Sequence, residues 1–265
     1  MKALGVIITC GLFALCGGRA EARAPVAASD TPAYLLVDVS SGHIVSARWN
    51  DPSCVLPFGS LIKPFVAIAY AEAHGMRYPR IACGGTADGC WYPAGHGRLS
   101  IVDAIAVSCN VYFQRLAEQI PDGRLRDTLK RLGIAADGSA IAPRAMIGLG
   151  DALRVAPLSL IHGYRELLSR AADPGIEPVV AGMRASARHG TGRALGVAVK
   201  PTDVLAKTGT APCVHRPRAP GDGYTIAVYP ADRPRLILLV QSHGHTGADT
   251  ARSAGDLLRA MVEVR

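Results

Sequence analysis

Short runs rich in apolar residues near both ends of the chain have the pattern of β-strands, and in one of them, His43–Trp49, apolar residues alternate with polar ones. Near the N-terminus two such runs flank the turn at Ser40-Ser41-Gly42 and predict a hairpin. Near the C-terminus three more runs follow, the last two joined by a turn that contains proline. The predicted strands are Ala33–Val39, His43–Trp49, Val204–Thr210, Asp222–Tyr229 and Arg235–Ser242.

The middle of the chain carries helical patterns instead. The segment from Ser60 to His74 is apolar almost all round and is followed by Gly75, which predicts a buried central helix that ends at the glycine. Further helices are predicted at Ser100–Val107, Val111–Gln119, within residues 121–146, at Pro157–Leu168 and at Gly247–Val262.

This order of elements predicts an α/β (α+β) fold. Strands from both chain ends form a five-stranded antiparallel sheet flanked by helices, and a mostly helical subdomain, roughly residues 76–200, is inserted between them. The chain has 265 residues, of which 49% are hydrophobic. That is enough for one large domain, which we place at residues 33–265.

The first 22 residues have the pattern of a secretory signal peptide. A basic start at Lys2 precedes an apolar run, and Ala20-Glu21-Ala22 matches a small-x-small cleavage site. We expect cleavage after Ala22, a flexible leader over residues 23–32, and a periplasmic or cell-envelope location without a stable membrane anchor. A lipoprotein at Cys16 is less favoured, because the large Leu15 precedes it.

The net charge of +8 does not indicate a nucleic-acid partner. Aromatic residues make up only 5% of the chain, and basic residues are scattered instead of alternating with aromatic ones. We therefore expect no nucleic acid among the partners.

Five of the seven cysteines lie beyond the predicted signal peptide. Export permits disulfides, and the Gly-rich loop between Cys83 and Cys90 would let these two pair. Cys54 and Cys213 could also pair, which leaves Cys109 unpaired. A zinc site made by Cys83, Cys90 and His96 is the less favoured alternative, because no Cys-x-x-Cys or His-x-x-x-His spacing supports it. We expect no metal and no cofactor.

Candidate chemistry begins with Ser60 and Lys63 in Ser60-Leu-Ile-Lys63. Residues three apart share a helix face, so the amine can lie against the hydroxyl and act as its base if burial or a second cation lowers its pKa. Lys207 could be that cation. Taken alone, the motif is equally a serine helix cap with an incidental lysine.

Ser108-Cys109-Asn110 interrupts two helical patterns. At such a break a hydroxyl can relay a proton and an amide can hold a substrate carbonyl. The alternative is that Ser108 or Asn110 only caps the next helix.

Lys207-Thr208-Gly209-Thr210 lies on a predicted strand. Gly209 inside a strand indicates close approach of another backbone, such as a substrate added at the strand edge, although a bulge would also explain it. Lys207 and the threonine hydroxyls could then bind a carboxylate. The N–H groups of Thr210 and Ser60 could form an oxyanion hole.

The three motifs in this order are shared by penicillin-binding proteins and serine β-lactamases. The chain resembles the class B penicillin-binding transpeptidase domain of the elongation and division type, from Ala33 to Met261. The similar segments are Gly95–Phe113, which leads into Ser-x-Asn, residues 147–160, which match the family's IGQG and TPLQ region, and residues 207–211, which match KTGTA.

The resemblance implies a role for each motif residue. Ser60 would be the acylated nucleophile, Lys63 its general base and Ser108 a proton shuttle. Asn110 would orient the substrate, while Lys207, Thr208, Gly209 and Thr210 would bind it. The implied reaction releases D-alanine from D-Ala-D-Ala stem peptides. The acyl-enzyme is then attacked by a second stem or by water, so the protein would be a DD-transpeptidase or DD-carboxypeptidase that also binds penicillin covalently.

Two departures from the family pattern are Pro212, where glutamate usually follows KTGTA, and Leu149, where glutamine is usual. A serine β-lactamase is one alternative function, although Glu166 falls inside a predicted helix with no asparagine after it. A non-turnover penicillin-binding or sensing module is another. Expected partners are stem peptides, β-lactams and a cell-wall polymerase.

Overall fold

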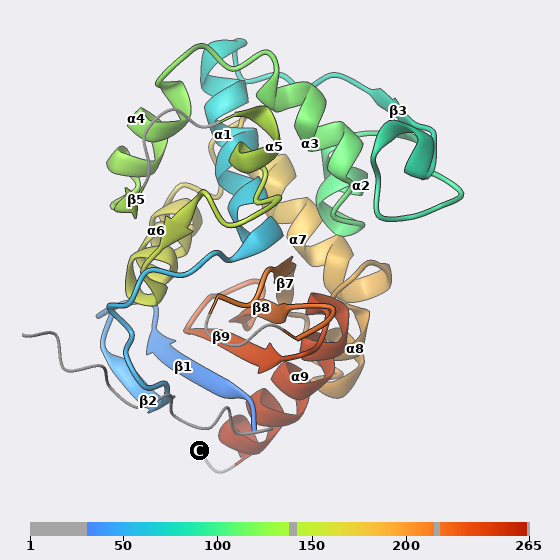
Figure 1. Ribbon diagram of the computed structural model, residues 1–265. Helices are drawn as coiled ribbons and strands as arrows, with labels where there is room; N and C mark the ends of the chain where they lie inside the picture. The colour runs from blue at the N-terminus through green and yellow to red at the C-terminus, as the bar shows by residue number, and fades with distance from the viewer. Residues whose placement is uncertain (1–30, 138–141, 215–217, 264–265) are drawn as a thin grey trace, which may run out of the picture.

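A five-stranded antiparallel sheet occupies the lower half of the computed structural model as seen in Figure 1, and the structure describes residues 31–137, 142–214 and 218–263. Its strand order is β2-β1-β9-β8-β7. The strands are β1 (Ala33–Asp38), β2 (Ile44–Arg48), β7 (Leu205–Ala211), β8 (Asp222–Tyr229) and β9 (Leu236–His243). The predicted fold class is confirmed, since the N-terminal hairpin joins the C-terminal strands through the pairing of β1 with β9.

The sheet is buried on both faces. Leu35 and Val37 of β1 pack into one hydrophobic cluster, and Leu36 between them packs into another, as the strand period of two requires. The second cluster lies against α8 (Arg193–Ala198) and α9 (Gly247–Glu263). The central strands β8 and β9 are therefore buried along almost their whole length.

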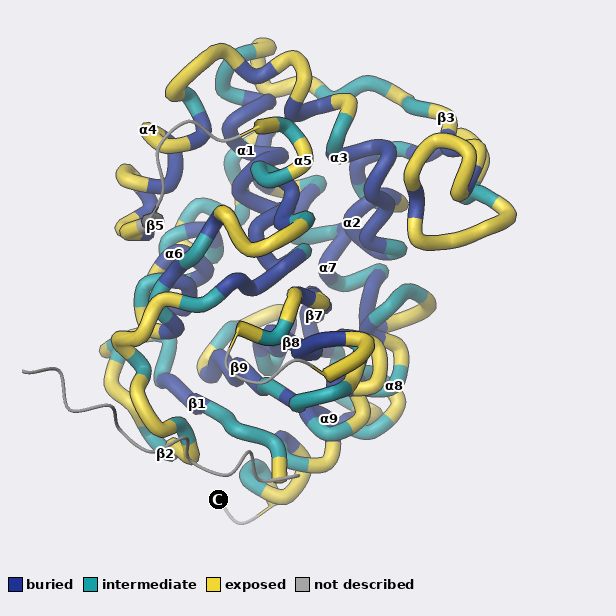
Figure 2. The backbone as a smooth tube through the Cα atoms, in the orientation of Figure 1, coloured by how far each residue is buried: buried dark blue, intermediate teal, exposed yellow. Residues whose placement is uncertain are grey.

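The opposite face carries the predicted central helix. It begins as a 3-10 turn, η1 (Gly59–Ile62), and continues as α1 (Lys63–Ala73), whose first nine residues are buried (Figure 2). Helices α2 (Ile101–Ala106), α3 (Asn110–Ala117), α4 (Arg124–Arg131), α5 (Pro143–Met146) and α6 (Pro157–Ser169) complete this upper part of the molecule.

Helix α7 (Glu177–His189) was not predicted, nor was α8. In α7 the small residues Gly182 and Ser186 weaken the helical signal, yet packing requires them. A Cβ on Gly182 would lie 2.6 Å from Cβ of Ile105 in α2. Tertiary packing thus overrides helix propensity here.

Two short sheets were also missed: β3 (Ile81–Cys83) with β4 (Gly97–Leu99), and β5 (Ala136–Asp137) with β6 (Arg154–Val155). They lie within the section predicted to be mostly helical.

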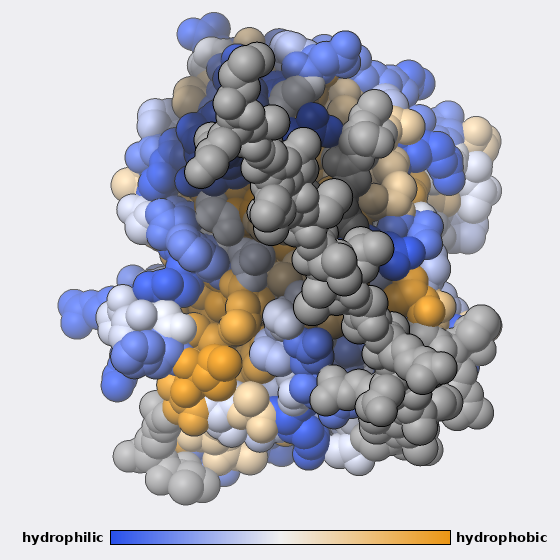
Figure 3. All heavy atoms as spheres, turned by 60° about the vertical axis from the view of Figure 1, so that its left-hand side comes forward, coloured by the Kyte–Doolittle hydropathy of each residue, from blue (hydrophilic) through white to orange (hydrophobic). Residues whose placement is uncertain are grey.

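The predicted signal peptide and all but the end of the leader, Thr31 and Pro32, lie outside the described residues. None of the helices in the described ranges is long and apolar enough to cross a membrane. From the side, the visible surface of the described residues is largely hydrophilic, with an apolar area in its lower half (Figure 3).

Candidate active site

The turn η1 holds Ser60 close to strand β7. Gly59 has φ +56°, and a Cβ on it would lie 2.2 Å from the backbone oxygen of Thr210. Only glycine allows this approach and this conformation without strain. Gly148 meets Gly59 from the other side, where an added Cβ would lie 2.0 Å from the Gly59 oxygen. The glycines therefore let three backbone segments meet at the serine.

The break between α2 and α3 presents Ser108 in the left-handed region, with φ +53°. Such a conformation is uncommon for a residue other than glycine. It directs the Ser108 carbonyl to Lys63 Nζ, at 2.8 Å, while the Ser108 hydroxyl accepts a hydrogen bond from Lys207 Nζ, at 2.8 Å. Neither Ser108 nor Asn110 caps α3, whose N-cap is Cys109 without a side-chain bond.

The Lys63 ammonium does not donate to the Ser60 hydroxyl in this structure. Its partners are the Ser108 carbonyl and Asn110 Oδ1, the latter at 2.7 Å. Lys207 donates to the Ser108 hydroxyl and to the Thr208 carbonyl, at 2.7 Å. Ser108 thus connects the two lysines, and Asn110 accepts a second hydrogen bond from Lys63.

The predicted residues come together around one pocket of about 350 Å³. Of the eight, six line it: Ser60, Ser108, Asn110, Thr208, Gly209 and Thr210. Lys63 and Lys207 lie below it, both with 0% of their surface exposed, and reach its lining through the bonds described above.

Six further residues line the pocket and were not predicted to do so from the sequence. They are Trp91, Leu149, Thr191, Thr246, Gly247 and Ala248. The Thr208 hydroxyl donates to the Thr191 hydroxyl at 2.6 Å, and Gly247 N–H donates to the Thr210 hydroxyl at 2.9 Å. The segment Thr246–Ala248 could have been predicted as the start of a helix, because Thr246 and Asp249 have the spacing of a helix-capping box. Thr191 lies between two glycines, a pattern that predicts a loop and gives no indication of the pocket.

Burial lowers the pKa of Lys63 to about 7, although the neighbouring Cys109 and Cys90 act in the opposite direction. Burial also lowers the pKa of Lys207 well below its usual value, and the charge of Lys63 adds to this effect. Within the described ranges, neither lysine forms an ion pair with a carboxylate. The pocket therefore lies above a lysine amine that can gain or lose its proton near neutral pH.

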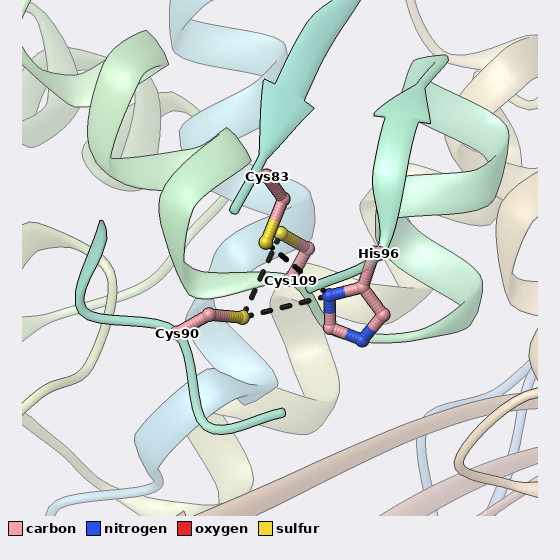
Figure 4. Close-up of side chains that lie close together, drawn as sticks. All are labelled: Cys83, Cys90, His96 and Cys109. Carbon is pink, nitrogen blue, oxygen red and sulfur yellow. Dashed lines mark hydrogen bonds between the residues drawn. The ribbon is translucent and has the colours of Figure 1, made fainter. Parts of the chain in front are cut away.

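The disulfide between Cys83 and Cys90 that the sequence allowed is not formed in this structure, where both are thiols. Cys54 is an exposed thiol, and the sulfur of the half-buried Cys213 lies 3.3 Å from His243 Nδ1. Cys83 and Cys90 instead both approach His96, with Sγ–Nδ1 distances of 3.6 and 3.5 Å (Figure 4). Cys109 is not isolated, because its sulfur lies 3.9 Å from that of Cys90.

The sheet, the helical layer and this constellation of serines and buried lysines define a transpeptidase-type protein. The family model described as the penicillin binding protein transpeptidase domain matches residues 49–263. The chain belongs to that family, as the resemblance predicted. No curated protein sequence matches it.

Solved structures of penicillin-binding proteins share its fold. PBP2 from Pseudomonas aeruginosa, in complex with WCK 5153, has a TM-score of 0.74 and 19% identity, covering 89% of this chain and 74% of that one. The transpeptidase domain of the D,D-transpeptidase FtsI4 from Legionella pneumophila has a TM-score of 0.65 and 21% identity, covering 89% and 90%. PBP2 of Helicobacter pylori, in its complex with MreC, has a TM-score of 0.70 and 17% identity, covering 89% and 60%.

Proposed function

We propose that this penicillin-binding transpeptidase acts through a serine acyl-enzyme on D-Ala-D-Ala stem peptides of peptidoglycan, and that penicillin acylates the same serine. The observation that carries the proposal is the hydrogen-bonded chain from Lys63 through Ser108 to Lys207, with Asn110 as a second acceptor for Lys63, beneath a pocket that Ser60 lines. The proposed base and proton relay are thus hydrogen-bonded to one another, and the proposed nucleophile lines the pocket above them.

In the proposed acylation, neutral Lys63 takes the proton of Ser60 as its oxygen attacks the carbonyl carbon of the penultimate D-alanine. The oxyanion is held by the N–H groups of Ser60 and Thr210, which the close contact between Gly59 and Thr210 supports. The C–N bond then breaks, and D-alanine leaves after its nitrogen receives a proton through Ser108. An amine of a second stem, or water, attacks the ester and returns the proton to Ser60.

The substrate carboxylate would bind at Thr208 and Thr210, which line the pocket. Lys207 would support it electrostatically, since its amine donates to the Thr208 carbonyl. A Cβ added to Gly209 would lie 2.4 Å from the backbone oxygen of Phe58, so the glycine lets β7 pack closely against the segment that leads into η1. A rigid strand edge suits a peptide that binds as an added strand.

The pocket offers no acidic side chain that could activate a deacylating water, since no Asp or Glu is among its described lining residues. Glu166 lies on α6 with 42% of its side chain exposed, near His162. This favours a long-lived penicilloyl-enzyme over a β-lactamase.

The related PBP2 of Helicobacter pylori has been solved in a complex with MreC. We extend the proposal to a site of action in the cell envelope, where the chain would act beside a cell-wall polymerase.

Labelling with a fluorescent penicillin tests the function. We expect stable labelling of the full chain, loss of label in Ser60→Ala, and no loss in the control Ser53→Ala, whose hydroxyl bonds Asp51. Release of D-alanine from a stem peptide should depend on Ser60 in the same way. Loss of label within seconds would instead make the protein a β-lactamase. Stable label without D-alanine release would make it a non-turnover module.

A further inference from the structure

Four metal-ligating side chains converge beside the active site, from segments distant in sequence. They are Cys83 at the end of β3, Cys90 and His96 in the loop between β3 and β4, and Cys109 between α2 and α3 (Figure 4). Their ligand atoms all lie within 4.8 Å of one another. We propose that these residues form a Cys₃His zinc site that fixes the Ser108-Cys109-Asn110 segment.

The distances between the ligand atoms fit a tetrahedral zinc ion. Zinc–sulfur bonds of about 2.3 Å and zinc–nitrogen bonds of about 2.0–2.1 Å imply S···S edges of about 3.8 Å and S···N edges of about 3.6 Å. The structure has 3.9 Å between the sulfurs of Cys90 and Cys109, and 3.6 and 3.5 Å from His96 Nδ1 to the sulfurs of Cys83 and Cys90. A disulfide needs sulfurs about 2.05 Å apart and would leave the third thiol without a partner.

The three sulfurs are enclosed by protein, and because burial raises the pKa of the Cys109 thiol, zinc would have to displace its proton on binding. The three cysteines are 4%, 5% and 0% exposed. Backbone N–H groups of Tyr92, Asn110 and Val111 donate toward the Cys90 sulfur, and that of Tyr112 toward the Cys109 sulfur. Hydrogen bonds of this kind favour the charged form of an acceptor.

The charge of the bound site also fits its position. Three thiolates with one divalent zinc carry a net charge of −1, and Lys63 is close enough to Cys90 and Cys109 to interact with both electrostatically. The site thus supplies a negative charge near the buried Lys63, which has no carboxylate partner in the described ranges.

All four ligands come from the protein, which is typical of a structural zinc ion and not of a catalytic one. The metal would tie the loop 83–96 to the α2–α3 break. Trp91, next to a ligand, lines the substrate pocket and donates from Nε1 to the Ser108 carbonyl at 3.3 Å, although 51% of its surface is exposed. Zinc would therefore position Ser108, Asn110 and Trp91 together.

The metal content of the full chain, purified without reductant or added metal, tests the proposal. We expect about one zinc per chain, released when a mercurial reagent modifies the thiols. Cys90→Ser and His96→Ala should each lower the zinc content at least tenfold, while the control Cys54→Ser, at an exposed thiol, should keep it. Cobalt in place of zinc should give the strong visible absorption of tetrahedral thiolate coordination.

A chelator should lower the melting temperature of the wild type by roughly 10 °C. It should also slow penicillin acylation, and adding zinc should restore both. Wild-type protein without zinc, or mass spectrometry showing a Cys83–Cys90 disulfide in it, would overturn the proposal. These two outcomes do not depend on whether the acyl-enzyme mechanism is correct, because zinc content and disulfides are measured without substrate.

Discussion

At the scale of single residues, the site depends on burying two lysine amines that form no ion pair with a carboxylate in the described chain. Burial favours the neutral amine, so Lys63 approaches the condition of a general base near neutral pH. Its bonds to Asn110 Oδ1 and the Ser108 carbonyl hold it in place. Sequence reasoning anticipated the lowered pKa, but it assigned Ser60 as the direct partner of the lysine.

The pH dependence of acylation tests this view of Lys63. With its pKa at about 7, the amine is mostly neutral above pH 7 and protonated below it. We expect the penicillin acylation rate to fall about tenfold per pH unit below pH 6, and to level off above pH 8. Stopped-flow or gel-based labelling from pH 5 to pH 9 measures the profile.

Lys63→Ala should slow acylation by roughly 10²–10⁴-fold and remove that profile. The control Lys200→Ala, at an exposed lysine, should leave rate and profile unchanged. A wild-type rate independent of pH between 5 and 8 would contradict the assignment of Lys63 as the base.

At the scale of elements, the site exists because η1, the α2–α3 break and β7 approach one another at the backbone. The motif residues themselves were visible in the sequence, since their chemistry is local. The walls that Thr191 and Trp91 supply were not, because α7, α8 and the β3–β4 loop reach the pocket only through tertiary packing. The same holds for Cys109, whose neighbour in space, Cys90, lies 19 residues away along the chain.

Gly59→Ala tests the contact between η1 and β7. Its Cβ would be placed 2.2 Å from the Thr210 oxygen, at a φ of +56°, so both a clash and a strained backbone result. We expect a loss of about 3 kcal/mol or more in the free energy of unfolding, together with slower acylation.

Gly75→Ala is the matched control for that substitution. Gly75 has φ +63° and nothing within 4 Å of an added Cβ, so only the backbone strain applies. We expect this variant to lose about 1 kcal/mol and to keep its acylation rate. Urea unfolding of both variants measures the difference, and equal losses would show that the η1–β7 approach is not tight.

At the scale of the whole molecule, short apolar runs bounded by turns were sufficient to predict the sheet. Strands β1, β8 and β9 present alternate residues to two separate hydrophobic clusters, so apolar residues follow one another directly in their sequences. Helices α7 and α8 were missed, because glycine and serine at their contacts remove the local signal that defines a helix. Predictions thus succeeded where local pattern and packing agree, and they failed where packing demands small residues.

The same buried lysines should make the stability of the whole domain depend on pH. The pKa of Lys63 is about 7 in the folded protein and 10.5 as its ordinary value, so between these limits the unfolded chain binds more protons than the folded one. The contribution of Lys63 to the free energy of unfolding therefore rises with pH through this window, by about 1.4 kcal/mol per unit. Below pH 7 both states are protonated, and the full penalty of the buried charge applies.

Lys63→Met removes this titration while keeping the length of the side chain. It also leaves Asn110 Oδ1 and the Ser108 carbonyl without their donor, a loss that does not change with pH. We therefore expect the stability of the variant relative to wild type to decrease by roughly 2–3 kcal/mol from pH 7 to pH 9, whatever its value at pH 7. Urea unfolding at both pH values measures it. A difference that stays constant would mean that Lys63 keeps its charge in the folded protein, and a different group would then have to serve as the base for Ser60.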